Sequence, residues 1–293
     1  MKKKYFYNSL LICMIFMQLM GCNNQKVKLN NKSGDNGSFA TSITSENATT
    51  KIVDYSKAFN GIGGCAVFYN NDKKEYQFYN KEACEIEVSP CSSFKIISTL
   101  IGLKNGILTS ADTKMKYNGT KYPLEAWNKD LTLKEAFQTS CVWYFRSVID
   151  KVGQDSMQAE LNEIHYGNCD IREWKGGNIN LLRELNGFWL ESSLKISPKE
   201  QVNVLSIIFE GKTDFSRKNI ETLKEIMLVE RKGNISIYGK TGTGFKNNAW
   251  FVGWLENGSE KYSFAVHLSD GKGKDISGQM AKEIALKIIS EYY

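Results

Sequence analysis

Three short motifs along the chain carry side chains that can perform acyl transfer. Ser92 and Lys95 lie three residues apart in Pro90-Cys91-Ser92-Ser93-Phe94-Lys95, Ser140 follows 48 positions after Ser92, and Lys240 opens Lys240-Thr241-Gly242. A serine becomes a nucleophile when a base removes its proton, and three residues along a helix bring a lysine back to the same face. Each motif alone occurs by chance, but their order along the chain predicts a serine nucleophile, Ser92, with Lys95 as its base.

Lys95 can accept a proton only if it is uncharged or chemically converted. Its usual pKa of about 10.4 would have to fall by roughly 2–3 units, which burial among apolar groups can achieve. We expect the apolar pocket to be formed by Phe94, Val142, Phe145, Trp189 and Leu190. Ser92 at a helix start would also face backbone N–H groups that favour developing negative charge.

The hydrophobic pattern predicts strands at both ends of the domain and helices between them. Residues 65–69 and 75–79 are β-rich runs around the turn Asn70-Asn71-Asp72, and residues 93–101 read as an apolar helix ending near Asn105-Gly106. Further helices are predicted over 140–152, 198–209 and 277–290, and further strands over 235–238, 249–255 and 262–268. This order predicts an α+β fold: an antiparallel sheet flanked by terminal helices, plus a mainly helical lobe. The Ser92 helix would start in the crevice between the two parts, with Lys240-Thr241-Gly242 on a strand edge beside it.

The N-terminus has the pattern of an export signal. Three lysines, an apolar run from Ser9 to Met20 and Leu19-Met20-Gly21-Cys22 resemble a bacterial lipoprotein signal peptide over residues 1–21, with Cys22 as the lipidated residue. Residues 22–54 are rich in Asn, Ser, Thr, Lys and Gly, which predicts a flexible tether. Residues 55–293 are then one catalytic domain, and we expect an exported lipoprotein on the extracellular side of the cell membrane.

Charge and cysteine content exclude several other classes of function. Removing Lys2, Lys3 and Lys4 from the net charge of +6 leaves +3, without the basic stripe of a nucleic-acid-binding protein. After Cys13 and Cys22, five cysteines remain, and with only two histidines and no C-x-x-C we expect no metal site. Buried free thiols are the expected state of these cysteines, which are Cys65, Cys84, Cys91, Cys141 and Cys169.

The motifs together resemble the class D, OXA-type, serine β-lactamases over the whole mature domain, in particular lipoprotein forms from clostridial-type Gram-positive bacteria. The resemblance rests on the Ser92–Lys95 motif and five further segments: Ser140-Cys141-Val142-Trp143-Tyr144, Tyr166-Gly167-Asn168, Phe188-Trp189-Leu190-Glu191, Lys240-Thr241-Gly242 and Trp250-Phe251-Val252-Gly253-Trp254. It implies hydrolysis of β-lactam antibiotics and hence resistance to them.

The resemblance also implies a role for each site residue. Ser92 would open the lactam, and Lys95, carboxylated by carbon dioxide, would be the general base. Trp189 would hold this carbamate together with Val142, and Ser140 would pass a proton to the lactam nitrogen, assisted by Lys240. Thr241, Gly242 and Thr243 would contact the substrate, and the N–H groups of Ser92 and Thr243 would form the oxyanion hole. No other cofactor is implied.

One departure concerns the substrate carboxylate. Family members commonly hold it with an arginine near the last strand and helix, but the last arginine here is Arg231, and the corresponding stretch runs from Asp275 to Lys282. Lys246, Thr241 and Thr243 are the candidates to replace it.

Two other functions use the same motifs. A β-lactam sensor is acylated once without efficient turnover, and the ending Gly278-Gln279-Met280-Ala281-Lys282-Glu283-Ile284 resembles sensor domains. A penicillin-binding transpeptidase or carboxypeptidase is the third possibility. The apolar N-terminal run ends in the lipidation motif rather than in a transducing helix, and Ser140-Cys141-Val142 departs from S-x-N, so we favour the hydrolase.

Overall fold

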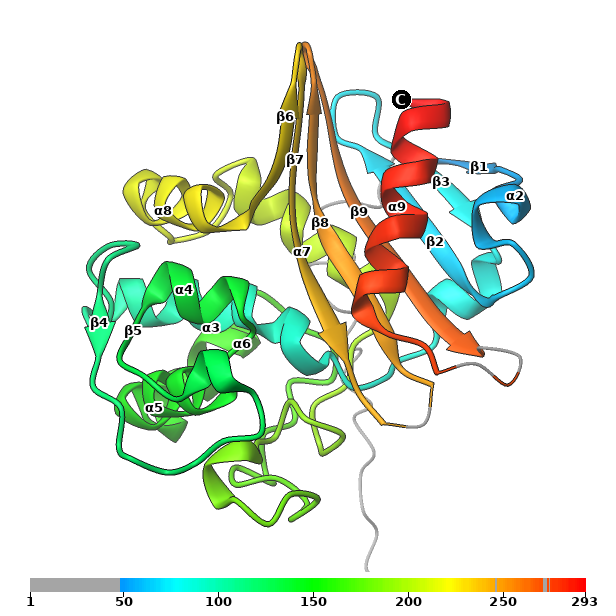
Figure 1. Cartoon of the computed structure of the whole chain (residues 1–293). Helices are drawn as coiled ribbons and strands as arrows, with labels where there is room; N and C mark the ends of the chain where they lie inside the picture. Colours follow the sequence, from blue (N-terminus) through cyan, green and yellow to red (C-terminus); the bar gives the residue numbers. More distant parts are fainter. Residues whose placement is uncertain (1–47, 246, 271–272, 274) are drawn as a thin grey trace, which may run out of the picture. The chain divides into compact units, whose positions relative to one another are not determined.

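The computed structural model describes residues 48–245, 247–270, 273 and 275–293. A seven-stranded sheet, with helices α7 and α9 on its two faces, lies beside a lobe of helices (Figure 1). The predicted α+β class, with its sheet, terminal helix and helical lobe, is confirmed.

The sheet has the strand order β1-β3-β2-β9-β8-β7-β6. All neighbours are antiparallel except β1 and β3. The predicted hairpin and the three predicted late strands are present, each late strand longer than expected. The strands are β1 (Thr49–Ile52), β2 (Gly63–Asn70), β3 (Glu75–Tyr79), β6 (Leu228–Lys232), β7 (Ile235–Thr243), β8 (Ala249–Asn257) and β9 (Glu260–Asp270).

Strand β6 pairs with only the first part of β7. Its register runs from Lys232 opposite Ile235 to Leu228 opposite Tyr238. Residues 239–243 of β7 therefore have β8 on one side, and no described strand on the other. This free edge carries Lys240-Thr241-Gly242, as the sequence predicted.

Two apolar cores hold the layers together. Helix α9 (Gly278–Tyr292) buries Ile284, Ala285 and Ile288 against one face of the sheet, and Ser277 caps its start by accepting from the Met280 N–H. Helix α7 (Pro198–Phe209) packs on the other face and begins with a capping box between Ser197 and Glu200. Such caps satisfy N–H groups that have no partner inside the helix.

The helical lobe comprises α3 (Lys95–Lys104), α4 (Leu133–Gln138), α5 (Val142–Val152), α6 (Gln154–Glu163) and α8 (Arg217–Met227). The sequence predicted α3 and α5 but not α4, α6 or α8. Helix α3 is buried along almost its whole length, so the apolar run of residues 96–103 forms the centre of the lobe. The remaining short elements are α2 (Ser56–Phe59), β4 (Lys114–Met115), β5 (Leu131–Thr132) and the 3-10 turns Lys81–Glu85, Cys91–Phe94, Glu125–Trp127 and Arg183–Leu185.

The N-terminal predictions fall mostly outside the described residues. The signal peptide, Cys22 and most of the tether lie there. The predicted tether boundary at residue 54 needs correction, because Thr49–Ile52 form edge strand β1 by parallel pairing with residues 75–78. Backbone pairing orders this segment even though its side chains are exposed. In the described part of the chain, no helix has the length and apolar character needed to cross a membrane.

The five cysteines of the domain carry free thiols, as expected. Cys65, Cys84, Cys91 and Cys141 are buried, whereas Cys169 is half-buried. Among the described residues there is no cluster of three or more side chains that could hold a metal ion.

Candidate active site

Ser92 lies on a tight turn at the start of the central helix. Residues Cys91–Phe94 form a 3-10 turn that continues into α3, and Cys91 has a left-handed backbone with φ of 49°. The Cys91 N–H donates to the Trp189 carbonyl at 2.9 Å, which ties the turn to the segment that carries Trp189. The serine that follows is half-buried.

Lys95 is the first residue of α3 and lies directly behind Ser92. Its Nζ donates to Ser92 Oγ at 2.8 Å, and its side chain is only 1% exposed. The ring of Phe145 lies 5.5 Å from the same nitrogen. Burial lowers the pKa of Lys95 to about 8, because the apolar surroundings disfavour the ammonium form. The predicted pairing of these two side chains is therefore present in the structure.

Ser140 and Lys240 form a second pair that joins the lobe to the sheet. Ser140 lies between α4 and α5 with a positive φ of 57°. Lys240 Nζ, from β7, donates to Ser140 Oγ at 3.0 Å and to the Thr241 carbonyl at 3.0 Å. Burial lowers the pKa of Lys240, and the nearby positive charges of Lys95 and Lys282 lower it further. The two pairs are thus close enough to interact electrostatically.

Close packing against the serine turn explains why a glycine, Gly242, follows Lys240-Thr241. A Cβ on Gly242 would lie 3.1 Å from the Pro90 carbonyl and 3.2 Å from the Ser93 nitrogen. The absence of a side chain lets β7 approach the serine turn closely. Thr243 is exposed at the end of β7, and its Oγ1 accepts from the Gly278 N–H at 2.9 Å.

Trp189 is fully buried in an aromatic cluster. Its ring stacks on Phe94, with centroids 6.0 Å apart, and the Arg146 guanidinium lies 5.5 Å from the centre of the indole ring. Its Nε1 is buried and has no hydrogen-bond partner among the described residues. Leaving such a donor unpaired costs about 1–3 kcal/mol, so its position suggests an acceptor supplied by another group.

Residues 166–168 support the serine turn from behind. Tyr166 is buried, and Gln201 donates to Ser93 Oγ at 3.0 Å while lying 3.5 Å from the Tyr166 hydroxyl. Gly167 has a φ of 55°, and a Cβ there would lie 1.9 Å from the Lys195 carbonyl. The segment thus fixes the back of the site through close backbone packing.

A buried polar network beside the serine turn was not predicted. Asn248 Nδ2 donates to the Ser89 carbonyl at 3.0 Å and to Glu191 Oε1 at 2.8 Å. Its Oδ1 lies 3.1 Å from His267 Nε2, and Cys91 Sγ lies 3.4 Å from Glu191 Oε1. In the sequence, three of its members lie in or beside the motifs: Cys91 precedes Ser92, Glu191 lies two residues after Trp189, and Asn248 lies two residues before Trp250.

Two cavities are bordered by residues of the site. An apolar one of about 220 Å³ is bordered by residues from the serine turn, α5 and the end of β7, including Cys91, Val142, Leu190, Thr243 and Phe245. Val142, the first residue of α5, therefore contributes to the wall of this cavity.

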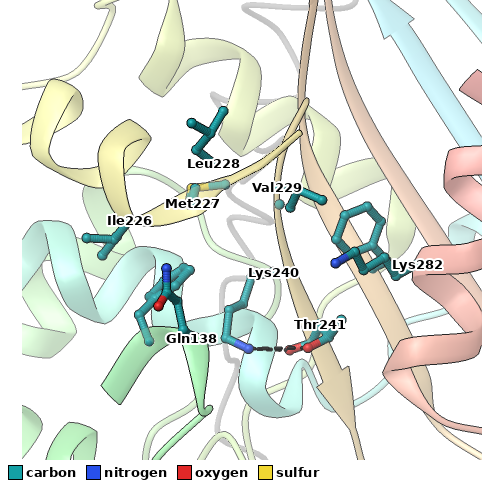
Figure 2. A pocket seen from close by; sticks show the side chains of 11 residues that line it. Gln138, Ile226, Met227, Leu228, Val229, Lys240, Thr241 and Lys282 are labelled. Atoms are coloured by element: carbon teal, nitrogen blue, oxygen red, sulfur yellow. Dashed lines mark hydrogen bonds between the residues drawn. The ribbon is translucent and has the colours of Figure 1, made fainter. Parts of the chain in front are cut away.

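The second cavity, of about 250 Å³, lies along the free edge of β7 (Figure 2). Its polar lining consists of Gln138, Lys240, Thr241 and Lys282, and the rest is mostly apolar. Lys246, one of the expected replacements for the missing arginine, lies outside the described residues.

Comparison with known proteins identifies a family and several relatives for this chain. The profile of the family "Penicillin binding protein transpeptidase domain" matches residues 19–290. The chain is 35% identical over 244 residues to "Regulatory protein BlaR1" of Bacillus licheniformis, covering 81% of this chain and 38% of that protein. It is 32% identical over 257 residues to "Beta-lactamase OXA-1" of Escherichia coli, covering 84% of this chain and 91% of that protein.

Solved structures give the same two relationships. "C-terminal domain of the Bacillus licheniformis BlaR penicillin-receptor" superposes with a TM-score of 0.75 at 34% identity, covering 83% of this chain and 96% of that one. "Structure of BPu1 beta-lactamase" superposes with a TM-score of 0.73 at 31% identity, covering 82% and 97%. The chain spans about two fifths of the full length of the curated BlaR1 relatives. The resemblance found in the sequence is confirmed.

Proposed function

The chain belongs to the family of penicillin-binding protein transpeptidase domains, and on that premise we propose that it is a class D serine β-lactamase. The observation that carries the proposal is the buried Lys95 amine 2.8 Å from Ser92 Oγ. The buried indole N–H of Trp189, which has no partner among the described residues, supports it. A lysine with a lowered pKa beside a serine is the arrangement that general-base activation requires.

The proposed acylation step uses both serine–lysine pairs. Ser92 Oγ attacks the lactam carbonyl carbon while its proton passes to the base at Lys95. The bond between the carbonyl carbon and the lactam nitrogen then breaks, and the nitrogen takes a proton from Ser140 Oγ. Lys240, which lies 3.0 Å from that oxygen, stabilises the serine as it loses its proton. The N–H groups of Ser92 and Thr243 are proposed to stabilise the carbonyl oxygen during the attack.

We propose that Lys95 carries a carbamate formed with carbon dioxide. The fit of the residues supports this, because Lys95 is buried with a lowered pKa and Trp189 Nε1 lacks an acceptor within the described residues. Trp189 would hold the carbamate by donating its indole N–H, and Val142 would shield it from water. When present, the carbamate supplies a general base for both acylation and hydrolysis of the acyl-enzyme.

A sensor function is the second candidate, and a specific observation favours it. Sensor relatives are 34–36% identical to this chain, compared with 29–32% for the β-lactamases. The match to this chain, however, covers 82–91% of the length of the β-lactamase relatives but only 38–40% of the length of the sensor relatives. This difference in coverage favours the β-lactamase. Both functions share the acylation of Ser92 and differ in whether the acyl group is then released.

The lifetime of the acyl-enzyme separates the two functions. The purified domain is mixed with an equimolar penicillin, and its intact mass is followed over time. A hydrolase gives an adduct that forms and disappears within seconds. An adduct that persists for hours would favour the sensor.

We further propose that Cys22 anchors the exported protein to the membrane by lipidation. The proposal rests on the sequence Leu19-Met20-Gly21-Cys22, which lies outside the described residues. Wild-type protein is expected in the membrane fraction of the producing cell, and Cys22→Ser is expected to release it or to leave the signal uncut. Fractionation with N-terminal sequencing tests this, and wild-type protein that is wholly soluble and begins beyond Cys22 would contradict the anchor.

A further inference from the structure

We propose that Lys282 binds the carboxylate of the substrate, in the cavity beside Lys240 and Thr241. The inference rests on the proposed reaction of Ser92 with β-lactams. It assigns a role to a lysine of α9 that the sequence did not identify, at a place where the family's arginine is missing.

The packing of α9 on β7 brings Lys282 to the free edge of the strand. Gly278, at the start of α9, donates its N–H to Thr243, and a Cβ on Gly278 would lie 2.9 Å from the Thr241 Cβ. Lys282 follows one helical turn later. Figure 2 shows its side chain extending from α9 toward β7, and its residue lines the same cavity as Lys240 and Thr241.

Gly239 lies on β7 next to Lys240 and borders the same cavity as Lys282. It has no side chain on the face of β7 that α9 covers. A Cβ there would lie 2.4 Å from the Phe251 ring, so the aromatic packing beneath α9 requires the glycine.

The charges in this cavity suit an anion. Its lining contains two lysines and no Asp or Glu among the described residues. Lys240 and Lys282 also take part in none of the ion pairs formed by the described residues. The positive charge of Lys282 is close enough to contribute to the lowered pKa of Lys240. A bound carboxylate would relieve this repulsion.

The connectivity of β-lactams relates the substrate carboxylate to Ser140 and Lys240. In penicillins and cephalosporins the carboxylate is attached to the carbon next to the lactam nitrogen. That nitrogen must approach Ser140, whose Oγ is hydrogen-bonded to Lys240 Nζ at 3.0 Å. The carboxylate carbon, two bonds beyond that nitrogen, would then lie on the Lys240 side of Ser140, toward the cavity that Lys240, Thr241 and Lys282 border.

The test compares a penicillin that has a free carboxylate with its neutral methyl ester. The rate of Ser92 acylation per unit concentration is measured for each compound by intact-protein mass spectrometry, so the readout does not depend on later hydrolysis. Lys282→Gln is expected to lower the preference for the free acid by about 10- to 100-fold, the range for losing one charge-assisted hydrogen bond, and to change the ester rate little. Lys282→Arg is expected to keep the preference.

Two further variants complete the test. Lys287→Gln removes a lysine from the exposed face of the same helix and is expected to leave the preference unchanged. Lys246→Gln tests the competing lysine named by the sequence. An unchanged acid preference in Lys282→Gln, an equal fall for acid and ester, or loss of the preference only in Lys246→Gln would overturn the assignment. If neither compound acylates the wild-type protein, the proposed reaction of Ser92 fails as well.

Discussion

Ser92→Ala is expected to abolish both covalent labelling and hydrolysis of β-lactams. The substitution removes the hydroxyl oxygen that the buried Lys95 amine contacts at 2.8 Å, so no acyl-enzyme can form. Removal of a catalytic nucleophile that is activated by a neighbouring base lowers kcat by a factor of about 10⁴ or more. The measurement is hydrolysis of a chromogenic cephalosporin, together with peptide mapping of the wild-type protein after reaction with a slowly released β-lactam.

Ser290→Ala provides the matched control for this variant. Ser290 lies on the exposed side of α9, and its hydroxyl donates to the Lys287 carbonyl within the same helix. This variant should keep full activity, and circular dichroism should show that both variants are folded. Adducts mapped to Ser140 or Cys91, or hydrolysis that survives in Ser92→Ala, would contradict the assignment of the nucleophile.

Trp189→Phe is expected to weaken the carbamate on Lys95 and to slow release of the acyl group from Ser92. Phenylalanine keeps an aromatic ring among Phe94, Phe188 and Arg146 but removes the N–H that has no partner among the described residues. Removing one donor that stabilises a charged catalytic group costs about 100-fold in rate. Acylation should fall less than hydrolysis, so the variant should accumulate acyl-enzyme.

A direct signal of the modified lysine accompanies this rate measurement. Protein equilibrated with carbon-13 bicarbonate should give a carbamate resonance in the wild type that is reduced in Trp189→Phe. Trp174→Phe is the control, because Trp174 belongs to the same aromatic cluster and stacks on Phe188. This variant leaves the indole N–H of Trp189 in place. Full activity in buffer free of carbon dioxide, with no carbamate resonance, would leave an unmodified lysine as the base.

The pH dependence of the same resonance follows from the lowered pKa of Lys95. Carbamate formation needs the neutral amine, and this pKa is about 8. The neutral fraction of an unmodified amine with that pKa is about a tenth at pH 7 and about a hundredth at pH 6. The carbamate signal and the activity should therefore decline together on acidification, and added bicarbonate should restore both in part.

Local sequence signals predicted the elements that hold the site. Pro198 and the Ser197–Glu200 capping box define the start of α7, and near-continuous runs of buried residues, many of them aromatic or β-branched, define β8 and β9. The Ser92–Lys95 pair follows from helical spacing alone. These features depend on residues a few positions apart, so the sequence is sufficient to predict them.

Features that depend on distant segments could not be predicted in this way. Asn248 reaches Glu191 from 57 positions away and the Ser89 carbonyl from 159, and no local pattern specifies such partners. The position of Lys282 could not be predicted either, because it depends on how α9 packs against β7. The segment at residues 49–52 was assigned to the tether because its strand is stabilised by pairing with β3 rather than by buried side chains.

The number of substrate equivalents consumed per protein molecule tests the proposed hydrolase most directly. Release of the acyl group at about 10 per second, rather than about 10⁻⁴ per second, corresponds to roughly 7 kcal/mol in the barrier. With a chromogenic cephalosporin in excess, the purified domain is predicted to consume about several hundred equivalents within a minute at the faster rate. Consumption that stops after one equivalent, with the acyl group still on Ser92, would contradict a hydrolase and identify a sensor.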